Sequence, residues 1–97
     1  MKEIRIFDKT GAFAGNKDIA RDIRLNEILK YIGDENKIVL DFSGVESATQ
    51  SFIHALISDV IRQRGINVLE RIYFKNCSIT IQKIISIVTE YMQESNY

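Results

Sequence analysis

The spacing of apolar residues in the first half of the chain predicts a strand, a helix and a second strand. Ile4 and Ile6 alternate with the polar Arg5, and Phe7 follows, which is the period of a short strand. From residue 17 the apolar positions recur at helical spacing until Gly33, where a glycine is typical of a helix end. Residues 38–42 form an almost continuous aliphatic run, which is typical of a strand covered on both faces.

A second helix is predicted to follow this run. Ser47 has Gln50 three residues after it, which matches a capping box and places the helix start near residues 48–50. Gly65 ends the helix. The predicted core face of this helix consists of Phe52, Ile53, Leu56, Val60 and Ile61.

The last third of the chain predicts one more strand and one more helix. Residues 66–69 are interpreted as either a loop or a short strand, and residues 71–75 as a strand. Asn76 and Ser78 are candidate caps for a third helix, which buries apolar residues at a spacing of three and four. The polar residues 93–97 are expected to fray.

The order of these elements indicates the fold class. Alternation of strand and helix predicts an α/β fold with a small mixed or parallel β-sheet flanked by helices and connected by right-handed crossovers. A further short strand within residues 8–16 is possible. With 97 residues, the chain is expected to form a single domain over residues 1–97.

Composition narrows the classes of partner. Lys plus Arg and Asp plus Glu both number 13, so no net charge attracts nucleic acid or an anionic membrane. The single cysteine, Cys77, allows no intrachain disulfide, and we interpret its thiol as a small buried apolar group in a cytoplasmic protein. No apolar run approaches the roughly 18 residues of a membrane span. We expect no cofactor and no metal site.

The glycine-containing segment of residues 11–16 lies between a predicted strand and a predicted helix, as a phosphate-binding P-loop does. It has one residue too few between its glycines, and Asp18 follows Lys17 where a P-loop needs Ser or Thr. We therefore interpret it as a turn in which Asn16 caps the helix. Binding of a small ligand or nucleotide by this segment, together with the turn near Gly44, stays open as the alternative function.

Three residue types that often carry catalysis lack the partners that catalysis needs. Asp8 and Asp41 lie near strand ends, but the neighbouring acidic residues of a phospho-accepting receiver are missing, so Asp41 is expected to bond N–H groups of its own turn. His54 follows Ser51 by three residues, yet no third group orients the imidazole. The chain is not expected to be an enzyme.

A polar stripe along the second helix is the better candidate for a working surface. It begins at Ser51 and continues through His54, Ser58 and Arg62, and we interpret it as solvated or facing a partner. A phosphate on the Ser51 hydroxyl would add close to two negative charges at the favourable end of the helix dipole. Such a switch needs no catalytic group in the chain itself.

The segment from Ile38 to Phe52, IVLDFSGVESATQSF, together with the later IYFKN, resembles the prokaryotic STAS-like family of unknown function. That family is distantly related to the anti-sigma-factor antagonists, in which the equivalent strand is followed by Asp-Ser-Ser-Gly-Leu and the second serine is phosphorylated by an anti-sigma kinase. On this resemblance Ser51 takes the position of the phosphorylated serine. Thr49 and Phe52 replace the aspartate and the glycine.

The resemblance implies a STAS-like fold and a regulatory protein-protein interaction module in signalling. The partner that the resemblance implies is a signalling protein such as a histidine-kinase-like ATP-binding protein. The resemblance and the polar stripe together predict one partner-binding face, in which Ser51 is the phospho-acceptor. This face consists of Ser43, Gly44, Glu46, Thr49, Ser51, His54, Ser58 and Arg62.

Overall fold

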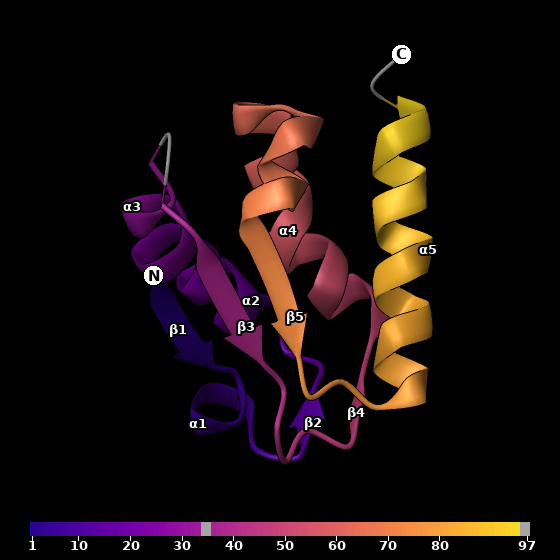
Figure 1. Cartoon of the computed structure of the whole chain (residues 1–97). Coiled ribbons are helices and arrows are strands. Elements are labelled where there is room, and N and C mark those ends of the chain that lie inside the picture. The colour runs from indigo at the N-terminus through magenta and orange to yellow at the C-terminus, as the bar shows by residue number, and fades with distance from the viewer. Residues whose placement is uncertain (34–35, 96–97) are drawn as a thin grey trace.

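The central sheet consists of three parallel strands in the order β1-β3-β5. In the computed structural model, which describes residues 1–33 and 36–95, these strands are β1 (Lys2–Arg5), β3 (Ile38–Asp41) and β5 (Ile72–Lys75) (Figure 1). Strand β3 lies in the middle, as the aliphatic run predicted. Each connection passes through helices, which confirms the α/β class and a sheet that is parallel rather than mixed.

Three helical segments carry most of the packing. The first runs without a break through α2 (Lys17–Ile23), a π-helical turn η1 (Arg24–Ile28) and α3 (Leu29–Tyr31). The second is α4 (Gln50–Arg64), which ends at Gly65 in the left-handed region with φ of 87°. The third is α5 (Ile79–Ser95), where the Ser78 hydroxyl accepts a hydrogen bond from the Ile81 N–H at 3.2 Å.

Smaller elements differ in part from the sequence-based prediction. A second sheet pairs β2 (Phe13–Ala14) with β4 (Ser47–Ala48), which confirms an extra strand within residues 8–16. Residues 66–69, predicted as a loop or strand, instead belong to the 3-10 helix η2 (Ile66–Arg71).

Both ends of the chain also depart from their predictions. The first strand ends at Arg5, so Phe7 opens the short helix α1 (Phe7–Thr10) rather than closing a strand. The predicted fraying was wrong for residues 93–95, which continue α5, and residues 96–97 lie outside the described part of the chain.

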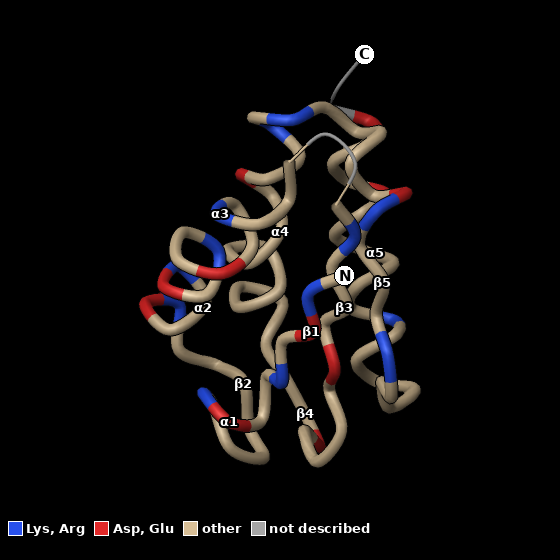
Figure 2. Tube along the Cα trace, turned by 60° about the vertical axis from the view of Figure 1, so that its left-hand side comes forward, with Lys and Arg blue, Asp and Glu red and all other residues tan. Residues whose placement is uncertain are grey.

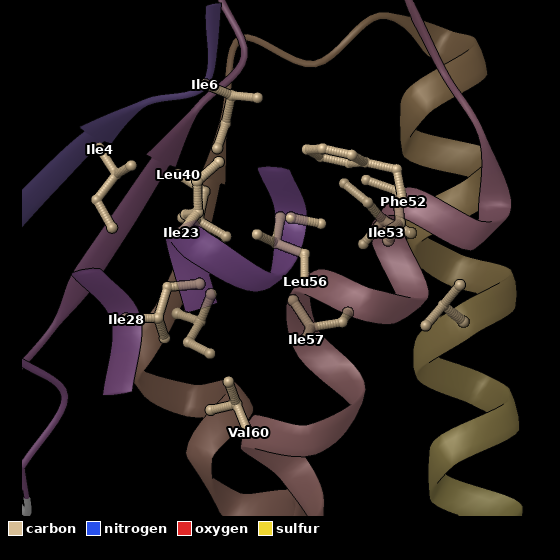
Figure 3. Close-up of a cluster of buried hydrophobic side chains, with 14 of the residues drawn as sticks. Ile4, Ile6, Ile23, Ile28, Leu40, Phe52, Ile53, Leu56, Ile57 and Val60 are labelled. Atoms are coloured by element: carbon tan, nitrogen blue, oxygen red, sulfur yellow. The ribbon is translucent and has the colours of Figure 1, made fainter. Parts of the chain in front are cut away.

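The core lies between the inner face of the sheet and the helices α2, η1 and α4. Figure 3 shows Ile4 and Leu40 from the sheet directed toward Leu56 and Ile57 from α4. All five residues predicted for the core face of α4 are fully buried. Burying a large apolar side chain contributes about 1.5–3 kcal/mol, so this layer fixes where α4 begins and which face it turns outward.

The outer face of the sheet is covered by charged and aromatic side chains rather than by a helix. Val39 points to this face yet is only 8% exposed. The Glu3 carboxylate and the Lys75 ammonium lie 3.9 Å apart across it, and the Lys37 ammonium lies 5.9 Å from the Tyr73 ring. Long charged side chains can cover apolar surface with their stems, so β3 is buried without a second helical layer.

Charges of both signs are interspersed over the surface. Figure 2 shows blue and red segments following one another along α2 and along the strands of the sheet. Within residues 1–33 and 36–95 no helix is long and apolar enough to cross a membrane. The same residues contain no cluster of three His, Cys, Asp or Glu side chains that could hold a metal ion.

Candidate functional site

The turn that follows β3 is organised by Asp41. Its carboxylate oxygen Oδ1 accepts hydrogen bonds from the Ser43 N–H at 2.9 Å and from the Asn76 amide at 3.0 Å. These two bonds, Asn76 first, hold the pKa of the Asp41 carboxyl below its ordinary value, although burial acts in the opposite direction. The positive charges of Lys75 and Arg5 lower the pKa further. The predicted role of Asp41 within its own turn is confirmed.

Ser43 and Gly44 are exposed at the tip of this turn. Gly44 has a φ of 86°, and a Cβ at this position would lie 2.9 Å from the ring of Phe7. Glycine is therefore required both for the backbone conformation and for the ring packed on it. Glu46, also exposed, donates its N–H to the Ala12 carbonyl at 2.8 Å, which ties the turn to the strand pair β2-β4.

The cap of α4 is Thr49, not Ser47. The Thr49 hydroxyl accepts a hydrogen bond from the Phe52 N–H at 3.0 Å, and the Thr49 N–H donates to the Ala14 carbonyl at 3.0 Å. Ser47 lies in β4, so the predicted capping box between Ser47 and Gln50 is wrong. Pairing with β2 holds Ser47 in an extended conformation, so the capping residue lies two residues later, while the helix begins at Gln50, within the predicted residues 48–50.

Ser51 lies in the first turn of α4 and is exposed. It lines an open hollow of about 450 Å³ formed by two helix starts, with Lys17 from α2 and with Gln50, His54 and Ala55 from α4. Because Thr49 already caps the helix, the Ser51 hydroxyl has no part in the cap. The hollow thus brings together Lys17, His54 and Ser51, whose hydroxyl has no hydrogen bond among the described residues, beside the positive end of the α4 dipole.

Lys17 and Gln50 were not among the predicted site residues. The signal for Lys17 was present, because Asn16 was correctly predicted to cap the helix that Lys17 begins. The Asn16 side chain accepts hydrogen bonds from Asp18 N–H at 2.8 Å and Ile19 N–H at 3.3 Å. What the sequence did not reveal is that β2-β4 pairing brings the starts of α2 and α4 together.

The polar stripe on α4 is only partly solvated. Ser58 is 2% exposed, so its prediction as a partner-binding residue is wrong. Helix α5 packs along this side of α4, and the ring of Tyr91 lies 6.3 Å from the half-buried ring of His54. His54 Nδ1 lies 3.4 Å from the Ser58 hydroxyl, and the described residues show no hydrogen bond between His54 and Ser51. Along the stripe, Ser51 and Arg62 are therefore exposed, His54 is half-buried and Ser58 is buried.

Arg62 is exposed but engaged in an ion-pair network. It pairs with Asp59 at 2.9 Å, and Asp59 also pairs with Arg24 of the π-helical turn at 3.0 Å. Arg24 in addition donates to the Ala55 carbonyl at 2.8 Å. This network fastens α4 to η1 and keeps the Arg62 guanidinium within its own helix, away from the hollow at Ser51.

Two of the three glycines considered for ligand binding, Gly15 and Gly44, lie against aromatic rings, and the third, Gly11, has open space beside it but donates its N–H to the Phe7 carbonyl at 2.8 Å. A Cβ on Gly15 would lie 2.5 Å from the ring of Phe13, and Gly44 lies under Phe7 in the same way. A phosphate cradle needs open backbone N–H groups at such glycines. The geometry around residues 11–16 and Gly44 therefore gives the small-ligand alternative no support.

This geometry predicts the result of a thermal-shift panel. ATP, ADP, GTP and cyclic nucleotides at 1 mM should leave the melting temperature unchanged, because a ligand that binds the folded state must raise it. A reproducible rise with one nucleotide, absent in a Gly15→Ala variant, would restore the alternative.

Cys77 has the inert character that was predicted. Burial, with a smaller contribution from the negative charge of Asp41, raises the pKa of its thiol to about 11. A thiol with such a pKa carries almost no thiolate at neutral pH. Cys77 packs against the core and is not a candidate nucleophile.

The comparison with known families covers most of this architecture. A family model described as a STAS-like domain of unknown function matches residues 21–82, from within α2 to the first turn of α5. The match includes β3, the turn after it, the start of α4 and all of β5. No curated protein and no solved structure matches the chain.

Proposed function

The chain belongs to the STAS-like domains of unknown function, and from this premise we propose that it is a non-enzymatic regulatory module that binds a signalling protein. The docking face is the first turn of α4 with the hollow beside it, flanked by the turn at Ser43, Gly44 and Glu46. Ser51 is the switch residue. The setting is the cytoplasm.

The observation that carries this proposal is that Thr49, and not Ser51, caps α4, so the Ser51 hydroxyl is not needed for the helix start. Thr49 caps α4 through its hydroxyl, and the Phe52 side chain is buried in the core. Ser51 lies between them with its side chain exposed. A residue with a free hydroxyl at a helix start can be modified without loss of the cap, so modification changes the surface and leaves the fold intact.

Phosphorylation would act through charge. An ATP-binding partner would transfer the γ-phosphoryl group of ATP to the Ser51 hydroxyl oxygen, releasing ADP, with the serine proton taken up by a base of the partner. The new dianion would lie beside Lys17 and at the positive end of α4, both of which favour it. A partner face that fits the neutral hydroxyl would then meet about two negative charges, which disfavours binding.

A phosphomimetic substitution tests the switch. Ser51→Asp is expected to weaken binding to the partner that co-purifies from the native cell by at least tenfold, about 1.4 kcal/mol, while Ser51→Ala changes affinity by less than about threefold. The measurement is isothermal titration calorimetry with the isolated partner.

Thr80→Asp is the matched control, because Thr80 is the second residue of α5 as Ser51 is the second residue of α4, and both are exposed. It adds the same charge at the same helical position and should leave affinity unchanged. Equal affinity of wild type and Ser51→Asp would rule out Ser51 as the switch.

A further inference from the structure

A groove between β5 and α5 lies apart from the hollow at Ser51. It has a volume of about 530 Å³ and shares no lining residue with that hollow. Figure 1 shows β5 at one edge of the sheet with α5 standing beside it. The groove is lined by Phe74, Asn76, Cys77, Gln82, Ile85 and Ser86.

The backbone of β5 presents free hydrogen-bonding groups toward this groove. The Lys75 carbonyl accepts the Phe42 N–H at 2.9 Å, so the backbone groups of Lys75 point toward β3. Neighbouring residues of a strand direct their backbone groups to opposite sides, so the Phe74 N–H and C=O point away from β3. Phe74 lines the groove, and neither group has a partner among the described residues.

The two edges of the sheet differ in how they are protected. Charged side chains occupy three of the four positions of β1, at Lys2, Glu3 and Arg5. Such residues discourage pairing with another strand. Strand β5 reads Ile-Tyr-Phe-Lys, with one charge at its end. The β5 edge is therefore the one left open to an added strand.

The groove also offers a place for a side chain next to that edge. Phe74, Cys77 and Ile85 supply apolar surface, and the other three lining residues are neutral and polar. None of the described residues that line it is charged. Asn76 directly follows β5 and lines the groove, where it turns the chain with φ of 59° and is held by its bond to Asp41.

We propose that this groove binds an extended peptide segment of a partner protein, which adds to β5 as a fourth strand and places uncharged side chains against Phe74 and Ile85. Backbone hydrogen bonds to Phe74 supply affinity, and the groove selects the side chain, as in other cases of strand addition. A four-residue strand spans roughly 13 Å, so about four peptide residues pair with β5.

The occupant is a peptide rather than a second folded copy. Because α5 stands beside β5, a second copy would have to bring its own α5 up to the same edge together with its β5 (Figure 1). A single extended segment has no such helix and can lie between β5 and α5. This site is independent of the proposed switch at Ser51, and either can fail without the other.

The test uses the whole chain and a defined probe. A phage-displayed library of random linear heptapeptides without cysteine is selected against the protein, and the most enriched peptide is synthesised. Ser86→Arg puts a long cation into the groove and should weaken binding at least about tenfold. Ile87→Arg is the matched control, since Ile87 is exposed on the next position of α5 outside the groove, and it should change affinity by less than about twofold.

Backbone pairing has its own readout. N-methylation of every second peptide residue removes the backbone N–H donors along one edge of the bound peptide. Of the two peptides methylated at alternate residues, the one that loses the N–H groups facing β5 should bind about tenfold more weakly, or worse. The Phe74 amide should exchange with solvent more slowly in the complex.

The proposal is overturned if no peptide is enriched, if Ser86→Arg binds as well as wild type, or if neither N-methylated peptide loses affinity. A concentration-dependent dimer abolished by Ser86→Arg would also overturn it, in favour of a second copy.

Discussion

Replacing Phe52 by alanine is expected to lower the free energy of unfolding by about 3–5 kcal/mol. The side chain is 0% exposed, and Figure 3 shows it extending from the first turn of α4 into the core near Ile53. Removing the ring leaves a cavity that the surrounding side chains fill only in part. Urea denaturation followed by circular dichroism measures the change.

Ser51→Ala is the control for this experiment, because Ser51 is the neighbouring residue and its side chain is exposed. Its effect should stay within about 0.5 kcal/mol. A loss below 1 kcal/mol for Phe52→Ala would mean that the ring is not a core element. In that case Phe52 would be available to a partner, and the docking face would have to be redrawn around it.

The burial of Phe52 also bears on the family pattern. On the resemblance to the anti-sigma-factor antagonists, Phe52 takes the place of a glycine, a small residue that would leave room for a kinase next to the serine. In this chain the ring points into the core, away from the exposed side chain of Ser51. The replacement therefore adds no bulk on the exposed side of α4 where the Ser51 hydroxyl lies.

Much of the fold could be predicted because its periodicities are strong. The aliphatic run at residues 38–42 has no polar interruption before Asp41, so its central place in the sheet followed directly. The three-four spacing of α4 likewise identified its buried face. Such patterns depend on local sequence alone, and here the tertiary structure agrees with them.

The errors arose where a distant segment decides the local structure. Ser47 matched a helix cap, but pairing of β4 with β2 holds it in a strand. Ser58 matched a solvated stripe, but α5 covers that side of α4. Lys17 reaches the hollow at Ser51 only through the same β2-β4 pairing. None of these contacts is visible in a pattern that spans fewer than thirty residues, roughly the length of one strand-helix-strand unit.

Asp41 is expected to make stability depend on pH on the acid side. Its pKa is lowered in the folded protein, mainly by the hydrogen bonds from Asn76 and Ser43. The resulting stabilisation is complete above the unfolded carboxyl pKa of about 3.9. It is lost as the pH falls through the lower, folded-state pKa, because the protonated carboxyl is a weaker acceptor.

Substitution of Asp41 separates the charge from the hydrogen bonds. Asp41→Ala should cost about 2–3 kcal/mol at pH 7, since it leaves the Ser43 N–H and the Asn76 amide without their acceptor. Asp41→Asn keeps one oxygen acceptor and should cost less, and it should also flatten the fall in stability as the pH drops below about 4. Urea denaturation across this range measures both effects. An Asp41→Asn variant with the same acid-side slope as wild type would show that other carboxylates cause it. Because Asn76 lines the groove beside β5 and loses its bond to residue 41 in Asp41→Ala, this substitution should also weaken any peptide bound there.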